Sequence, residues 1–197
     1  MALGVGLTHY FSDTLTAHAA VAYDFSDGRD SAGNFTYRSL QLPLGATLDT
    51  RDSKTEAARG YYLDLGAKPF FGFGATDDGA RLTMDARAYK ALGAKGGAVL
   101  AGRLQGGAIL GASALGTPRT DLFYSGGGGT VRGQAYQSLG ISVLDGATWV
   151  DTGGTAFLAA SVEARMKVSA NIGVVGLVDA GAVGQGTVTG ADSYWQA

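Results

Sequence analysis

Polar and apolar residues alternate with a period of two along most of the chain, and this pattern limits the fold more than any other feature. In residues 80–89 the even positions are all apolar, whereas the odd positions carry arginine, threonine, aspartate and tyrosine. The same alternation recurs in 17–26, 61–68, 98–107 and 157–168. A period of two sends successive side chains to opposite faces of a strand, so the pattern predicts an all-β protein.

The alternating segments predict eight antiparallel strands joined by connections of unequal length. We expect the strands at 2–11, 15–25, 34–50, 60–70, 79–91, 96–110, 155–167 and 171–185. We expect short or modest turns near 12–14, 51–59, 92–95 and 168–170, and longer loops near 26–33, 71–78 and 111–154. Aromatic residues gather near the expected strand ends, as in the pairs Tyr61–Tyr62 and Phe70–Phe71.

The composition favours a transmembrane β-barrel over a soluble sandwich. Charged residues make up 16% of the chain, less than the roughly 25% of a typical soluble domain. The apolar faces consist largely of alanine and glycine, which would build a poor soluble core, whereas mixed charges on the other face suit a wet lumen. Aromatic girdles and connections that alternate in length fit the same class. The longest run without charged residues, 104–118, is too short for a membrane helix.

Closure of the sheet requires more strands than the chain supplies. In lipid every backbone group must be hydrogen-bonded, so the strands must form a closed barrel. Eight strands leave an interior that side chains fill, and a loop as long as 111–154 would not fit. About sixteen strands leave an aqueous lumen. We therefore expect a fragment that ends at 193–197 as a strand begins, and we expect the isolated chain not to form a stable monomeric barrel.

The alternation also assigns side chains to the two faces of the sheet. We expect these to point outward: Leu82, Met84, Leu100, Val162 and Met166. We expect these to point inward: Arg81, Asp85, Arg87, Arg103 and Glu163. A shift of one residue in any strand would reverse its assignment.

The long loop carries an arginine shortly after four glycines, in the segment Gly126-Gly-Gly-Gly-Thr-Val-Arg132-Gly133. Two expected strands downstream each offer one acid in an otherwise uncharged neighbourhood, Glu163 and Asp179. We expect Arg132 to lie within about 4 Å of one or both. The alternative is that Arg132 is a solvated surface charge and that both acids meet water in the lumen. A phosphate-binding loop is excluded, because Lys-Ser or Lys-Thr does not follow the glycines.

Other functional classes lack the residues that they need. A net charge of −2 argues against a nucleic-acid partner. The chain has no cysteine and only two histidines, so neither a metal site nor another cofactor is expected. An enzyme would have to use Asp49, Arg51, Asp52 or Ser125, and no histidine stands with them in an organised motif. The first ten residues do not resemble a secretory signal.

Two segments resemble the BamA/TamA family of outer-membrane assembly proteins. Residues 42–53 and 58–65 are similar to the surface-antigen barrel signature, which falls here on Asp49, Arg51, Asp52, Arg59, Gly60 and Tyr61. Residues 123–140 are similar to the lid loop of that family, whose motif falls on Val131, Arg132, Gly133 and Gln134. The family usually has Phe or Tyr at the last of these positions, and Tyr136 is a candidate substitute.

The resemblance implies a place in the barrel for the whole chain. Residues 1–197 would be a partial surface-antigen barrel domain, corresponding to about strands 6 to 13 of sixteen, with the lid loop at about 111–154 and the periplasmic POTRA domains absent. Arg132 would lie at the tip of the inward-folded loop, with Glu163 and Asp179 as its partners in the lumen.

The resemblance also implies a function without covalent chemistry, in the bacterial outer membrane. The chain would belong to an assembly or translocation factor that inserts client β-barrel proteins. The TamA branch, associated with autotransporter assembly, is the most similar; the alternatives are BamA-like general barrel assembly, a two-partner secretion pore and a passive porin. The implied partners are outer-membrane lipid, client outer-membrane proteins including autotransporters, and a periplasm-spanning partner subunit.

Overall fold

The structure is a computed structural model that describes residues 2–30, 33–93, 97–169, 172–189 and 193–196. Its strands are β1 (Ala2–Tyr10), β2 (Leu15–Asp30), β3 (Gly33–Gln41), β4 (Leu44–Asp49), β5 (Gly60–Phe73), β6 (Gly79–Leu92), β7 (Ala98–Leu110), β8 (Ile141–Asp145), β9 (Thr148–Thr152), β10 (Ala156–Lys167), β11 (Gly173–Gly184) and β12 (Ser193–Gln196). In the described part of the chain, no helix is long and apolar enough to cross a membrane.

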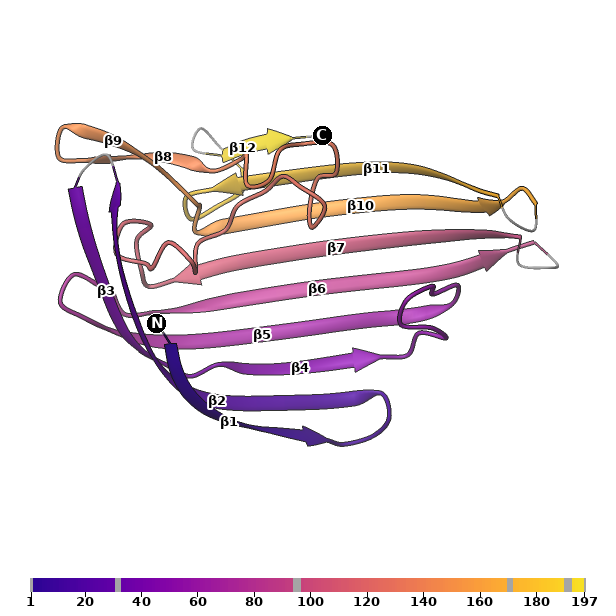
Figure 1. The fold of residues 1–197 in the computed structure, drawn as a ribbon, viewed down its shortest axis with the longest axis horizontal. Coiled ribbons are helices and arrows are strands. Elements are labelled where there is room, and N and C mark those ends of the chain that lie inside the picture. The colour runs from indigo at the N-terminus through magenta and orange to yellow at the C-terminus, as the bar shows by residue number, and fades with distance from the viewer. Residues whose placement is uncertain (1, 31–32, 94–96, 170–171, 190–192, 197) are drawn as a thin grey trace.

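Ten of the described strands form one antiparallel sheet (Figure 1). Its order is β1-β2-β3-β5-β6-β7-β10-β11-β12, and β4 pairs with β2 and β5. The remaining two, β8 and β9, form a separate hairpin. The prediction of an all-β antiparallel fold is confirmed.

The register of the sheet separates an apolar outer face from a charged inner face. Directly paired residues share a face, and Met84 lies opposite Gly106, whereas Arg87 lies opposite Arg103. Arg103 also pairs with Ser161, two residues before Glu163. Pairing across β6, β7 and β10 thus puts all five predicted outward side chains on one face and all five predicted inward ones on the other. We call the second, which the loop 111–154 contacts, the inner face.

A proline divides the strand predicted at 34–50 into two, so that prediction is wrong. Proline has no backbone N–H, so Pro43 cannot donate a hydrogen bond to the ladder at this point. Pro43 accepts a hydrogen bond from the Ala20 amide at 2.8 Å, and Leu42 donates to the Pro69 carbonyl at 2.9 Å. The neighbouring strands therefore stay attached across the break, with β2 pairing first with β4 and then with β3.

The loop predicted at 26–33 is also wrong, because β2 and β3 continue through most of it. Ser26 pairs with Tyr37, and the ladder reaches Asp30 opposite Gly33. The described polar residues of this stretch, within 26–30, lie in a paired strand and do not form an open loop. Residues 31 and 32 of the predicted loop lie outside the described residues. The turns predicted at 92–95 and 168–170 fall partly outside the described residues.

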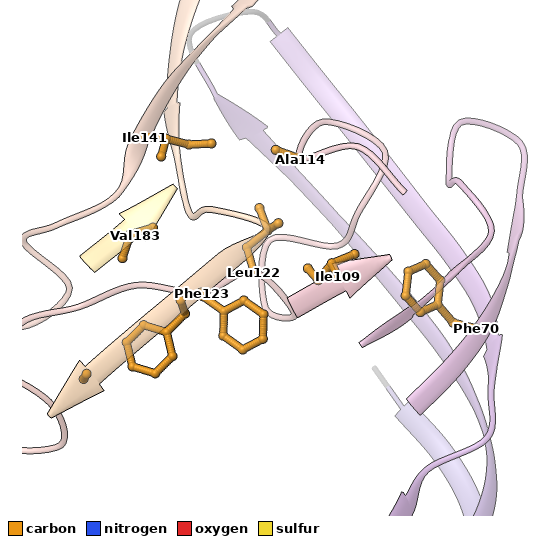
Figure 2. Close-up of a cluster of buried hydrophobic side chains, with 9 residues drawn as sticks. Phe70, Ile109, Ala114, Leu122, Phe123, Ile141 and Val183 are labelled. Carbon is orange, nitrogen blue, oxygen red and sulfur yellow. The ribbon is translucent and has the colours of Figure 1, made fainter. Parts of the chain in front are cut away.

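The long connection 111–154 contains structure that the sequence analysis did not predict. The hairpin β8–β9 turns at Gly146-Ala147, between the paired residues Asp145 and Thr148, and Gly146 has a φ of 60°. Residues of this connection pack on the sheet in a buried apolar cluster: Phe70, Ile109, Ala114, Leu122, Phe123, Ile141, Phe157, Ala159 and Val183 (Figure 2). The core of the described chain therefore sits between the loop and the inner face.

Candidate functional site: the inward-folded loop and its contacts with the sheet

The base of the loop is fixed to the inner face before the glycine run begins. Isolated bridges join Phe123 to Gly154 and Ser125 to Leu139. The Phe123 ring stacks on Phe157 of β10, with centroids 5.8 Å apart. A Cβ at Gly107 of β7 would overlap the same ring. The sheet therefore has a glycine at the position where the Phe123 ring packs against β7.

The tip of the loop is a tight turn that needs glycine. Gly126 and Gly127 have φ values of 103° and 90°, a region that side-chain-bearing residues rarely adopt. The Gly127 amide donates to the Val131 carbonyl at 3.1 Å and closes the turn. Val131 is buried against β11, where a Cβ at Gly181 would lie 2.9 Å from Val131 Cγ2. Because Val131 packs so closely on β11, the next residue, Arg132, lies at the inner face.

Arg132 binds two carboxylates on neighbouring strands. Its Nε and Nη2 donate to the two oxygens of Asp179, each at 2.8 Å, and its Nη1 donates to Glu163 Oε2 at 2.6 Å. The Arg132 backbone amide also donates to Asp179 at 2.9 Å. Asp179 pairs with Ser161 of β10, two residues before Glu163, so both acids share the inner face. The planar guanidinium matches this pair of acceptors.

The two acids favour the charged form of the loop arginine. They raise the pKa of the Arg132 guanidinium above its ordinary value, with Asp179 the larger cause and Glu163 the second. The Asp179 side chain is almost fully buried, whereas about a third of the Arg132 side chain remains exposed. The structure thus brings Arg132, Glu163 and Asp179 together, with the loop covering an acid that would otherwise face the open interior.

Further charges continue this cluster across the inner face. Arg165 also contacts Glu163, so that acid is shared by two guanidinium groups. Asp85 binds both Arg87 and Arg103, each at 2.7 Å. Arg103 Nη1 in turn donates to the Gly129 carbonyl of the loop tip at 2.9 Å. The tip is therefore held by β7 as well as by β10 and β11.

The remaining motif residues do not contact the two acids. Gly133 has a φ of 89° and continues the turn. Gln134 is exposed. Tyr136 does not supply the missing aromatic contact with the wall, because its side chain is 80% exposed and lies near Gly127. The expectation that Tyr136 substitutes for an aromatic residue at position 134 is therefore wrong.

The predicted barrel signature orders the connection between β4 and β5 and does not touch Arg132. Arg51 forms an ion pair with Asp49 at 2.7 Å and lies over the Tyr62 ring at 4.8 Å. Asp52 Oδ1 accepts the backbone amides of residues 58 and 59, and these donors lower the pKa of Asp52. At Gly60, a φ of 96° and the nearby Thr50 carbonyl leave no room for a side chain.

The other residues of the barrel signature, and the residues that an enzyme would have to use, occupy structural positions in the fold. The Arg59 side chain is exposed, and Tyr61 is exposed on the outer face. The Ser125 hydroxyl is fully buried and has no hydrogen-bond partner among the described residues. Asp49, Arg51 and Asp52 serve the connection after β4. In the described ranges, no group of three or more His, Cys, Asp or Glu residues could hold a metal ion.

Sequence reasoning missed a second set of contacts at the base of the loop. The Asp121 carboxylate forms an ion pair with Lys68 of β5. The Asp121 carbonyl accepts a hydrogen bond from Arg81 Nε at 2.8 Å, and the Arg81 guanidinium lies over the Phe123 ring at 4.5 Å. Arg81 was predicted to point inward, but no local pattern indicated its partner.

The fold and the site together define a class of protein. An antiparallel sheet with an apolar outer face and a polar inner face, against which a long loop is packed, is the architecture of an outer-membrane β-barrel with an internal plug. The chain belongs to the Omp85 superfamily, because the model of the Omp85 superfamily domain matches residues 1–195.

Comparison with solved structures agrees on the fold. The chain is similar to BamA from Haemophilus ducreyi lacking POTRA domains 1–3, with a TM-score of 0.78 and 14% sequence identity. The match covers 93% of this chain and 41% of that chain, so the protein described here spans less than half of the length of that BamA chain. None of the curated proteins compared with the chain matches it.

Proposed function

We propose that the chain is part of an outer-membrane factor that assembles other β-barrel proteins and inserts them into the membrane. Membership of the Omp85 superfamily and the BamA-like fold support this proposal. The observation that carries it is the binding of Arg132 to Glu163 and Asp179, which holds the loop tip against the inner face. A passive pore has no need of a loop locked in this way.

The physical role proposed for the loop is to hold the wall of the complete barrel in register. One guanidinium bridges β10 and β11, and sliding these strands by one residue would turn one of the acids to the other face. With that wall fixed, the seam between the first and last strands of the complete barrel can open. A client strand would then add to the exposed edge through backbone hydrogen bonds.

The outer face is the surface proposed to meet lipid. Large apolar side chains are exposed there on several strands: Leu3, Val5, Leu7, Leu82, Leu100, Val162, Met166 and Val178. In a protein surrounded by water, so many exposed apolar side chains would favour association. In an outer membrane they are the expected lipid-facing band of a barrel.

The finer assignments are proposals built on the motifs. Residues 1–197 would form about strands 6 to 13 of a barrel of about sixteen, and the complete protein would carry POTRA domains and bind a periplasm-spanning partner subunit. The segment Val131-Arg-Gly-Gln-Ala-Tyr-Gln-Ser-Leu139 and the preceding glycine run support a TamA-like branch and autotransporter clients. The structural likeness to BamA supports general barrel assembly as the second candidate.

The proposal is tested by reversing the charge of Arg132 in the full-length protein. Arg132→Glu should impair client assembly in cells that depend on it, because a third carboxylate would then face Glu163 and Asp179. Adding Glu163→Arg should restore part of the activity. Arg29→Glu, a charge reversal at an exposed residue near the far end of β2, is the matched control. Normal assembly by Arg132→Glu at normal barrel levels would contradict the proposal.

A further inference from the structure

Asp121 is a second charged residue of the loop that binds the inner face, and its charge is opposite to that of Arg132. Its carboxylate meets Lys68 Nζ of β5 and lies 3.4 Å from Gln41 Nε2 of β3. Its carbonyl accepts from Arg81 of β6. The residue is 8% exposed, and Gln41 is held in turn by Ser39 Oγ at 3.0 Å. Three strands therefore supply polar partners to one buried residue of the loop.

The two charged contacts lie on opposite sides of β7 in the sheet. Asp121 binds β3, β5 and β6, whereas Arg132 binds β10 and β11, and the order between them is β5-β6-β7-β10-β11. Arg103 of β7 holds the Gly129 carbonyl between the two contacts. The loop thus crosses the inner face as a bridge that is attached on both sides and in the middle.

The opposite charges of Asp121 and Arg132 disfavour a seating of the loop in which the two residues exchange places. Asp121 in the place of Arg132 would meet Glu163 and Asp179, and Arg132 in the place of Asp121 would meet Lys68 and Arg81. Like charges at short range disfavour such alternatives, and this gives specificity beyond the attraction of each pair. We propose that Asp121 is a positioning residue that seats the base of the loop on β3, β5 and β6, so that the tip reaches Glu163 and Asp179.

The burial of the loop agrees with this division between base and tip. Thr117, Leu122 and Phe123 at the base are buried, whereas Gly128 and residues 133–138 of the tip are exposed. An error in the position of the base would therefore displace the tip even when the three residues of the Arg132 cluster are intact. This inference rests on the proposed function only for its effect on client assembly, since the seating of the loop can be measured on purified protein.

Thiol labelling at position 125 reports the seating of the loop in the purified full-length protein. Ser125 is fully buried and its hydroxyl has no partner among the described residues, so Ser125→Cys removes no hydrogen bond seen there. The chain has no cysteine of its own; any cysteine elsewhere in the full-length protein is replaced first. Alkylation of a buried thiol requires local opening, and its rate follows the population of the open form when closing is fast.

In this background, Asp121→Lys and Lys68→Asp should each raise the alkylation rate by about tenfold or more, because each leaves unpaired or like charges at the base. The double variant Asp121→Lys with Lys68→Asp should return to within about threefold of the parent, and Asp121→Glu should stay near it. Arg29→Glu is again the control. A single variant within about twofold of the parent, or a double variant as reactive as the singles, would overturn the proposal.

If the Asp121→Lys variant does not fold, a neutral substitution at the same position tests the contact with Lys68. Asp121→Asn keeps an acceptor oxygen but removes the charge, and it should raise the alkylation rate by about threefold or more. An unchanged rate in Asp121→Asn would also overturn the proposal. Because labelling does not depend on client insertion, a seated loop in a protein without assembly activity would refute the proposed function and leave this inference standing.

Discussion

Replacing Arg132 with lysine keeps the positive charge of the loop tip but removes the planar fork that binds two carboxylates. The guanidinium donates three side-chain hydrogen bonds, two to Asp179 and one to Glu163. An ammonium group has three N–H donors, but they share one nitrogen and lack the planar fork that spans both carboxylates, so we expect about two of the three hydrogen bonds to be lost. Arg132→Lys should therefore release the tip without unfolding the sheet.

The size of the effect follows from the exposure of the site. A hydrogen bond to a charged group contributes about 1.5–3 kcal/mol when solvent is excluded. The Arg132 side chain is 34% exposed, and exposed ion pairs contribute about 1 kcal/mol or less. Two lost contacts at about 1 kcal/mol each give about 2 kcal/mol, which corresponds to a roughly 30-fold larger population of released tip.

Amide hydrogen exchange in the full-length protein measures that population. Exchange in residues 127–135 should accelerate by roughly 10- to 30-fold in Arg132→Lys, while the central amides of β10 and β11 keep their protection. Arg29→Lys is the matched control for the loss of a guanidinium. If residues 127–135 exchange within about twofold of the parent in Arg132→Lys, the fork geometry does not hold the tip.

Three further substitutions test other parts of the account. Gly107→Ala should lower the free energy of unfolding by about 1–3 kcal/mol, because the new methyl group overlaps the Phe123 ring. Gly102→Ala is the control and should change the free energy little, because its methyl group meets open space. Equal effects of the two substitutions would refute the close contact at Gly107. Asp52→Ala should disorder the connection after β4 more than Asp52→Asn in hydrogen exchange. Because the pKa of Asp52 is lowered in the folded state, its contribution to the stability of this connection should be present above the ordinary carboxyl pKa. That contribution should be lost as the pH falls through the lowered pKa. A connection that already loosens at neutral pH would contradict this. Val162→Arg should cost up to about 2–4 kcal/mol in a bilayer if the outer face meets lipid, and unchanged stability there would place that face in water.

The two faces of the sheet could be predicted from sequence because the period of two is a local property of a strand. Met84 and Arg87 went to opposite faces as expected. The errors came from signals that were present and misread. Pro43 marks the break between β3 and β4, and Gly146-Ala147 between short alternating segments fits a two-residue hairpin loop with glycine at its first position.

The contacts at the base of the loop could not be predicted in this way. Asp121 lies 53 residues from Lys68 and 80 residues from Gln41 along the chain. No periodicity links positions so far apart, and only the order of the strands brings them together. The Arg132 contacts were easier to anticipate, because Glu163 and Asp179 are the only acids in the two strands expected at 155–167 and 171–185.

The proposed assembly function can be measured as the insertion of a client barrel into lipid vesicles. Full-length protein reconstituted in vesicles should accelerate the insertion of a urea-unfolded outer-membrane β-barrel protein, and Arg132→Gln, which loses the charge held by Glu163 and Asp179, should abolish most of that acceleration. Arg29→Gln should behave as the parent. A protein that conducts small solutes but does not accelerate insertion, or an Arg132→Gln variant as active as the parent, would contradict the account.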